Sequence, residues 1–558
     1  MSQLQVPLGI DYYEAISTSC YYVDKTNIIE TISNSPLGTC LLFTRPPRFG
    51  KTLMISMLQT FFEQNEEDKS RFFIDKQIWK NKEIIEKEFQ KYPLIHLNLK
   101  NVIGTDYDTL VNKLKEYMRK EYQRHMSILD LNILNKYDVA YYNSILASTE
   151  SVSDLTSSLA RLSEFIYQAY KKHVIILIDE YDTPVHYAYD NGYYDEAIIL
   201  FKQLFGESLK SNPVIRFAVL TGILQIAKES LFSGVNNLVT NSILSKNMDE
   251  AFGFNEREVK EILKYYNLSD KYETANEWYG GYRFGNSIIF NPLSILNFVQ
   301  NDGETAPYWS NTGESRTLAK LLTPDNVNLL LPLMSDENIE TEVDIAISYK
   351  DLDDSFISTC SYLLSSGYLA IKNVYEATYE LNLPNKEIKQ VFKKEVRGRY
   401  ISSAQLPVAM KIKRAFENGD INSLEKLIEN YLLSSMSSFK LKNEKNYQII
   451  LGTALSIIFE NAYVKNEFKA GQGRADLVVI PKNDNKLGFV LETKYLKWRT
   501  GKDRLIESAK DALNQIKIKE YDQELIKLGI KNILLFGVSF SMGKIAIQCE
   551  QKKGQLIS

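Results

Sequence analysis

The chain has 558 residues, too many for one hydrophobic core, and its length indicates two or three domains. Its 44% hydrophobic and 24% charged residues are typical of a globular protein, and its few glycines and prolines argue against long disordered linkers. The net charge of −4 excludes a protein that binds nucleic acid through its overall charge, so any basic surface must be local.

The N-terminal residues show no signal-peptide pattern, and no segment approaches the roughly 18 apolar residues of a membrane span. The four cysteines are far apart and have no metal-ligand spacing, which is typical of reduced thiols inside the cell. We therefore expect a soluble cytoplasmic protein with no membrane contact.

The first informative stretch is a turn between an expected buried strand, residues 39–43, and an expected helix, residues 53–62. Gly50-Lys51-Thr52 forms the second half of a P-loop, in which backbone N–H groups and a helix N-terminus hold phosphate. Lys51 would reach the β- and γ-phosphates, and the Thr52 hydroxyl would bind Mg²⁺. Arg45 stands where the usual pattern has its first glycine, so a basic turn without a nucleotide remains an alternative.

A second stretch supports the nucleotide site. The aliphatic run 174–178 is typical of a parallel strand buried on both faces, and it ends in Asp179-Glu180. P-loop ATPases need an acid at this place for Mg²⁺ and often a second to polarise the attacking water. We assign Asp179 to the metal and Glu180 to the water, so the chain is expected to bind ATP and magnesium.

The segments that follow complete the expected ATPase domain. Another strand, residues 214–220, leads to Thr221, which either senses the γ-phosphate or caps a following helix. Residues 252–294 are rich in aromatic and turn residues and predict a small helical lid over the nucleotide. Residues 362–383 predict the helix and strands of a winged-helix-like module, which in other proteins binds DNA or only packs.

The C-terminal part carries a separate set of polar residues. Its expected order is helix (446–461), strand (463–468), strand (475–480), strand (488–494), helix (504–519) and strand (532–538). Residues two apart in a strand share a face, so Glu492 and Lys494 must project together. If Asp476 lies on the neighbouring strand, two carboxylates would hold a divalent ion and the lysine would stabilise charge on phosphorus.

Two further polar residues flank this set. Gln515 on the following helix is placed to lean into the site, and Glu444 is either another metal-side acid or a capping or surface residue. Lysines and arginines outnumber acids between Glu492 and Glu520, which would help a polyanion approach but is also typical of a solvated helix face.

Six segments together resemble a prokaryotic family that joins an AAA-ATPase-like domain to a C-terminal PD-(D/E)XK nuclease-superfamily domain. They are residues 45–52, 178–182, 220–222, 232–234, 278–282 and 473–476. The family's turn typically reads R-P-R-R-F-G-K-S/T, so the missing glycine is a family trait. Pro47 replaces one arginine, and Arg48 remains as a candidate nucleotide contact. The resemblance also implies a nuclease-like fold with Asp476, Glu492 and Lys494 as its catalytic set.

The expected fold is therefore α/β: a P-loop parallel sheet with helices on both faces, a helical and winged-helix-like middle region, and a restriction-endonuclease-like domain. We place these domains at residues 1–240, 241–400 and 401–558. The favoured function is an ATP-regulated nuclease that uses Mg²⁺, or Mn²⁺ at the second site, on DNA or RNA. The alternative is a signalling or scaffold NTPase whose nuclease-like domain binds nucleic acid or protein without cleaving. An oligomer is compatible with either.

Overall fold

The computed structural model describes residues 3–226, 231–232, 235–309, 318, 320–352, 355–400, 406–435, 444–459, 462–482, 487–497, 500–541 and 544–553. Ser233 and Gly234 of the predicted family motif therefore lie outside the described residues. The chain divides into two compact units. The first contains Met1–Thr312, Thr341–Tyr379 and Pro384–Ile388, and the second contains Gly313–Glu340, Glu380–Leu383 and Lys389–Ser558.

The first unit contains a five-stranded parallel sheet, as predicted. Its strands in spatial order are β2 (Leu94–Asn98), β3 (Val174–Asp179), β4 (Ile215–Gly222), β1 (Thr39–Thr44) and β6 (Leu238–Asn241). Every residue of β1 and β3 is buried, because helices cover both faces and the aliphatic runs exclude water from both sides. β4 lies between β1 and β3 and is parallel to both. The carboxyl ends of all three strands therefore lie at the same edge of the sheet.

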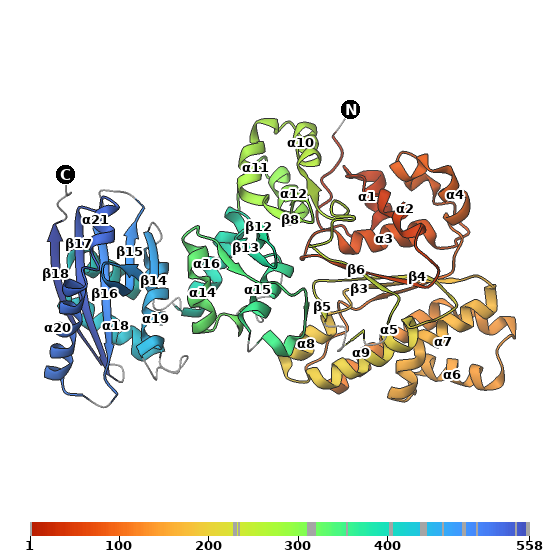
Figure 1. Ribbon diagram of the computed structural model, residues 1–558. Helices are drawn as coiled ribbons and strands as arrows, with labels where there is room; N and C mark the ends of the chain where they lie inside the picture. Colours follow the sequence, from red (N-terminus) through yellow and green to blue (C-terminus); the bar gives the residue numbers. More distant parts are fainter. Residues whose placement is uncertain are drawn as a thin grey trace. The chain divides into compact units, whose positions relative to one another are not determined.

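Figure 1 shows helices on both faces of this sheet. One face carries α1 (Tyr13–Ser19), α2 (Asn27–Ser33), α3 (Lys51–Phe62) and α4 (Lys82–Glu88), and the other carries α5 (Tyr107–Arg124), α6 (Lys136–Ala147), α7 (Val152–Tyr170) and α9 (Tyr194–Leu209). Ser151 caps the N-terminus of α7, where its side chain accepts from the Asp154 N–H, and α7 buries Leu155, Leu159 and Leu162 at helical spacing. α8 (Thr183–Asn191) follows the end of β3.

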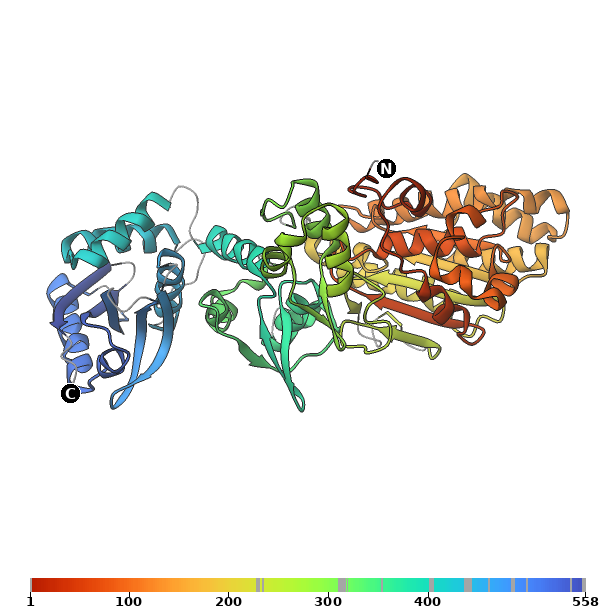
Figure 2. The ribbon, with the colours of Figure 1, turned by 90° about the horizontal axis from the view of Figure 1, so that it is seen from above.

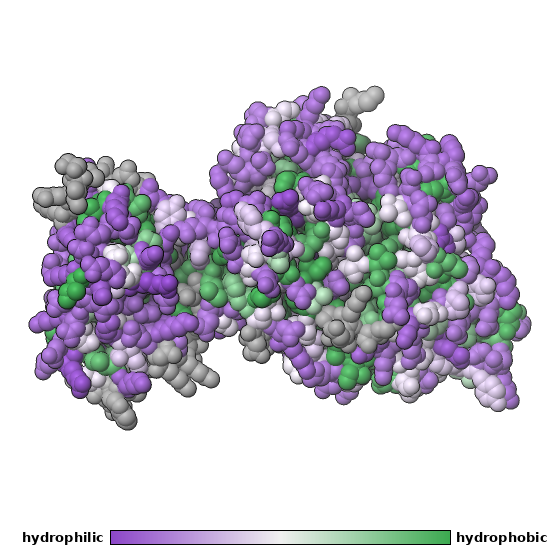
Figure 3. All heavy atoms as spheres, in the orientation of Figure 1, coloured by the Kyte–Doolittle hydropathy of each residue, from purple (hydrophilic) through white to green (hydrophobic). Residues whose placement is uncertain are grey.

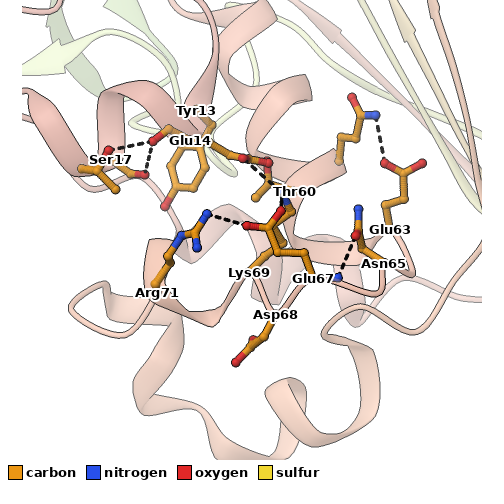
Figure 4. Close-up of polar contacts among 12 residues, drawn as sticks. Tyr13, Glu14, Ser17, Thr60, Glu63, Asn65, Glu67, Asp68, Lys69 and Arg71 are labelled. Carbon is orange, nitrogen blue, oxygen red and sulfur yellow. Dashed lines mark hydrogen bonds and ion pairs between the residues drawn. The ribbon is translucent and has the colours of Figure 1, made fainter.

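A polar cluster fastens the loop after α3 to the N-terminal helix α1 (Figure 4). Lys69 Nζ contacts Glu14 at 3.2 Å and Glu67 at 2.7 Å, and Arg71 also binds Glu67. Beneath this cluster the Tyr13 hydroxyl donates to the carbonyl of Phe72 at 3.0 Å. These contacts add to the burial of Phe72, Phe73 and Ile78 in a loop that also contains 3₁₀ helices at Ser70–Phe72 and Gln77–Lys80.

The remainder of the first unit includes residues 252–294, which we call the lid region; their role as a lid over the nucleotide stays a prediction. A small sheet has the order β7 (Phe254–Asn255), β9 (Ser287–Phe290) and β8 (Tyr282–Phe284), with helices α10 (Glu256–Tyr265), α11 (Tyr272–Tyr279) and α12 (Pro292–Gln300). Strand β5 (Gln225–Ile226) pairs with β11 (Ala346–Ile347), and α15 (Phe356–Ser365) precedes β12 (Ala370–Tyr375). The chain passes between the units at β10 (Ile339–Thr341), β13 (Thr378–Asn382) and α16 (Lys386–Tyr400).

The second unit contains a five-stranded mixed sheet, seen obliquely in Figure 2. Its order is β14 (Ala462–Ala470), β15 (Gly473–Pro481), β16 (Leu487–Tyr495), β17 (Asn532–Ser541) and β18 (Lys544–Lys553), and only β16 and β17 are parallel. The helices are α14 (Pro324–Met334), α17 (Leu406–Asn418), α18 (Ile421–Ser435), α19 (Glu444–Ile458), α20 (Lys502–Ile518) and α21 (Gln523–Lys527). The predicted order of elements is confirmed; β18 adds a strand that was not predicted.

The face of the molecule in Figure 3 is largely hydrophilic, with apolar side chains scattered among polar ones. Within the described parts of the chain, no helix is both long enough and apolar enough to cross a membrane. The α/β fold class with two sheet-based domains is confirmed, whereas the boundaries at 240 and 400 stay predictions.

Candidate active sites

The turn between β1 and α3 has the backbone of a phosphate-binding loop. Arg48 and Gly50 both have positive φ, 69° and 92°. Left-handed residues of this kind are typical of turns whose backbone N–H groups form a concave anion-binding surface. Gly50 adopts this conformation without a steric penalty, and α3 starts at the next residue. The Arg48 side chain is exposed. The sequence therefore places a helix N-terminus and a concave run of amides at one point.

Lys51 lies across this turn. Its side chain is only 4% exposed, and Nζ donates to the carbonyls of Arg45 at 3.0 Å and Pro46 at 3.3 Å. The nearest carboxylate oxygen is Oε1 of Glu180, at 4.0 Å. The ammonium thus sits between the turn and the end of β3, where it can exchange the two carbonyls for phosphate oxygens.

Asp179 is the centre of a polar group at the carboxyl edge of the sheet. It is fully buried; Oδ2 accepts from Thr52 Oγ1 at 2.8 Å and Asn98 Nδ2 at 3.1 Å, and Oδ1 accepts from Thr221 Oγ1 at 2.5 Å. Four elements, α3, β2, β3 and β4, supply these side chains. Asn98 was not selected from the sequence, although its place at the end of a strand next to β3 would have indicated it.

Thr221 belongs to β4 and does not cap a helix. After Gly222 the chain reaches β5 at Gln225, so the predicted alternative of an N-cap is wrong. The Thr221 hydroxyl lies between Asp179 and the backbone N–H of Glu180, which is 3.4 Å away. Glu180 itself has a positive φ of 55°, which turns its side chain back toward Lys51.

Asp182 joins the acidic segment to the end of β4. It is 2% exposed, and Oδ2 accepts from the N–H groups of Ile223 and Leu224 at 2.9 Å each. Burial and the neighbouring charge of Glu180 raise the pKa of Asp182 to about 6. A Cβ on Gly222 would lie 2.6 Å from Asp182 Oδ1, so only glycine fits here. Asp182 lies in the motif segment 178–182, but the sequence predicts no role for its carboxylate.

Arg45 explains why the turn needs no first glycine. Its side chain is fully buried and points away from Lys51: NH1 donates to the Asn241 carbonyl at 2.9 Å and NH2 to Asn241 Oδ1 at 2.6 Å. The rings of Phe252 and Phe284 lie 5.0 and 5.2 Å from its guanidinium carbon. Arg45 is therefore an anchor for the outside of the turn, and burial lowers its pKa to about 9.

The second candidate site lies on β15 and β16. Their antiparallel pairing ends at Leu477↔Leu491, directly next to Asp476 on β15 and Glu492 on β16. Lys494 Nζ lies 3.3 Å from Glu492 Oε1, and Gln515 on α20 donates to the same oxygen. The structure thus brings together the three predicted residues and Gln515. The fifth candidate, Glu444, starts α19 and accepts from the Tyr495 N–H at 3.2 Å, and burial raises its pKa.

Glu492 carries an unsatisfied buried oxygen. The residue is 2% exposed, and its Oε2 has no hydrogen-bond partner. Burial, followed by the charge of Asp476, raises the pKa of Glu492 to about 7. Two neighbouring carboxylates and an orphaned oxygen fit a divalent cation, which binds oxygen and offsets their repulsion.

Both sites have side chains that could hold a divalent cation. Among the residues that the structure describes, no group of three or more His, Cys, Asp or Glu side chains is arranged to hold a metal by itself. Thr52 with Asp179, and Asp476 with Glu492, each supply two oxygen-bearing side chains. This number suits Mg²⁺, which keeps several waters and completes its shell with substrate phosphates.

Comparisons with known proteins agree with these two units. Residues 7–232 match the family described as "Predicted AAA-ATPase", and residues 442–550 match the PD-(D/E)XK nuclease superfamily. The chain is also similar to a protein of Azotobacter chroococcum mcd 1 named "Uncharacterized protein in vnfD 5'region". The two are 27% identical over 415 residues, which cover 72% of this chain and 71% of the relative.

Proposed function

We propose that this chain, which combines an AAA-ATPase-like domain with a PD-(D/E)XK nuclease-superfamily domain, binds and hydrolyses ATP in the first and cleaves nucleic-acid phosphodiesters in the second. The observation that supports the proposal is the presence of two separate clusters of carboxylate, hydroxyl and lysine side chains, each at the strand ends of its own sheet.

In the ATPase half, the N–H groups of the turn and Lys51 would hold the β- and γ-phosphates, with Arg48 at the exposed side. Thr52 and Asp179 would hold Mg²⁺, which supplies charge neutralisation at the phosphates when bound. Glu180 is placed next to Lys51 and would orient the attacking water and accept its proton. Thr221, bonded to Asp179, would report the γ-phosphate to β4.

In the nuclease half, Asp476 and Glu492 would hold Mg²⁺ or Mn²⁺, which would activate water and polarise the phosphodiester. Lys494 would donate to the phosphate oxygen on which negative charge develops. Gln515 holds Glu492 Oε1, so that its other oxygen stays directed to the site. DNA or RNA would then be the substrate of this half.

The nucleotide site is tested with Lys51→Ala. Loss of a charged hydrogen bond to phosphate should weaken ATP binding by about 10- to 100-fold, measured by calorimetry or a fluorescent ATP analogue. Lys76→Ala is a matched control, because Lys76 is also a buried lysine but pairs with Asp75 outside the site. Unchanged ATP hydrolysis in Lys51→Ala would contradict the assignment.

The nuclease site is tested by incubating the protein with Mg²⁺ or Mn²⁺ and plasmid, single-stranded DNA or RNA, with and without ATP. Asp476→Ala should abolish cleavage, whereas Asp511→Ala, an exposed acid on α20, should not. Absence of cleavage in the wild type under every condition would count against the nuclease. Nucleic-acid binding that survives Glu492→Ala in such a protein would instead favour the non-cleaving NTPase.

A further inference from the structure

Thr493, the residue between Glu492 and Lys494, takes part in the second site without being one of its predicted members. It is fully buried on β16. Its backbone N–H donates to Asp476 Oδ2 at 2.7 Å, and its hydroxyl donates to the same oxygen at 2.8 Å. One carboxylate oxygen of Asp476 therefore has two donors from a single residue.

Gln448 on α19 fixes the direction of this hydroxyl. Its Nε2 lies 2.8 Å from Thr493 Oγ1. An amide NH₂ can only donate, so Thr493 Oγ1 must accept from Gln448, and its single proton is left for Asp476. The result is a one-way chain of hydrogen bonds from α19 through β16 to β15.

The chain of bonds leaves one oxygen of each carboxylate open. Asp476 Oδ2 is occupied by Thr493, and within the described residues no donor reaches Oδ1. Glu492 Oε1 is occupied by Lys494 and Gln515, while Oε2 is buried and has no partner. Since hydrogen bonds to a ligand fix its orientation, the two open oxygens are held available together.

We propose that Thr493, oriented by Gln448, is a positioning residue that holds Asp476 so that its second oxygen faces the divalent cation. The proposal rests on the metal site of the proposed nuclease. Alternation along β16 gives it a geometric basis: Glu492 and Lys494 project to one face and Thr493 to the other. Thr493 can therefore bind Asp476 from the α19 side while Glu492 and Lys494 remain toward Gln515 and α20.

The test measures Mn²⁺ binding to the full chain by electron paramagnetic resonance, without nucleotide. The variants are Thr493→Val, which keeps the shape but removes the hydroxyl, Thr493→Ser, which restores it, and Gln448→Leu. Binding that survives in Asp476→Asn is subtracted, because it belongs to other sites. Thr453→Val is the matched control, since Thr453 is a fully buried threonine of α19 whose hydroxyl donates only to the Ile449 carbonyl.

We expect Thr493→Val to weaken the Asp476-dependent Mn²⁺ binding about 10- to 100-fold, with Gln448→Leu weaker in effect and Thr493→Ser close to wild type. A purely structural role of Thr493 would give the opposite order of effects, because Thr493→Val keeps the packed shape of the side chain whereas Thr493→Ser loses a methyl group but keeps the hydroxyl. If Thr493→Val fails to fold, the comparison of Gln448→Leu with Thr493→Ser and with the wild type replaces it.

The outcomes separate this proposal from the site on which it rests. Equal Mn²⁺ binding by wild type and Asp476→Asn would remove the metal site itself. Asp476-dependent binding that is unchanged in Thr493→Val and Gln448→Leu would overturn the positioning role alone. An equal loss in Thr453→Val would assign the effect to packing of α19 and would also overturn it.

Discussion

At the residue scale, Glu492 is a side chain whose ionised form is disfavoured in the folded chain. It is a buried carboxyl next to Asp476, with one oxygen unpartnered and a pKa raised to about 7. An unfolded glutamate has a pKa of about 4.3. Between these values the folded chain holds more protons than the unfolded chain, so the free energy of unfolding should fall as pH rises through this window.

Replacing Glu492 with Gln should remove this effect. The amide cannot ionise, so we expect Glu492→Gln to be more stable than the wild type at pH 8 without metal, by about 1–3 kcal/mol. The same change should abolish Mn²⁺ binding at the site. Urea unfolding at pH 5.5 and 8, with and without Mn²⁺, measures both. A wild type whose metal-free stability does not fall over this range would contradict the assignment of the pKa.

At the element scale, the phosphate-binding turn is held from outside by the lid region of the same unit. The Phe49 ring packs 5.1 Å from the rings of both Tyr282 and Phe284 on β8, and its carbonyl accepts from the Gly253 N–H at 3.1 Å. Arg45 makes the adjoining contacts with Asn241, with the same Phe284 ring and with the ring of Phe252. The conformation of the turn therefore depends on packing against β8 as well as on Gly50 within the turn.

Phe49→Ala tests this link. The cavity should lower the free energy of unfolding by about 3–5 kcal/mol, and the loosened turn should also weaken ATP binding in the protein that remains folded. Phe165→Ala is the control, because Phe165 is equally buried, on α7, and contacts Tyr141 and Tyr142 instead of the turn. Thermal unfolding and ATP titration measure the two effects. Equal ATP affinity in the two folded variants would show that the packing does not shape the site.

At the scale of the whole molecule, the two candidate sites lie in different compact units. Lys51, Thr52 and Asp179 belong to the first unit, and Asp476, Glu492 and Lys494 belong to the second. Each unit has its own sheet and its own buried core. Ligands that bind one unit should therefore stabilise that unit directly.

Calorimetric unfolding of the full chain should show two transitions. In the presence of Mg²⁺, ATP at about 100 times its dissociation constant raises the free energy of unfolding of the unit that binds it by about 2.7 kcal/mol. We expect this shift in one transition only and expect Lys51→Ala to remove it, whereas Asp476→Asn should leave it in place. A single transition that shifts as a whole would mean that the units unfold together.

The sequence was most informative where one residue type allowed one structure. The aliphatic runs before Thr44 and Asp179 predicted strands buried on both faces, and both strands are confirmed. It was least informative about partners far along the chain. Asp182 binds the backbone at the end of β4, and no local pattern marks this contact. Asn98 binds Asp179, and only the order of the strands in the sheet indicates that contact. The N-cap reading of Thr221 failed because β5, not a helix, follows.

By itself the sequence determined the two-part α/β architecture, the turn that ends in Gly50-Lys51-Thr52, and the acids that close β3, because periodicity and glycine placement are local properties of the chain. Only the tertiary structure decided that Arg45 binds Asn241, that Thr493 binds Asp476, and that Gln448 binds Thr493. These contacts join residues from separate elements. Which of their atoms meet depends on strand register and helix packing, which no short stretch of sequence contains.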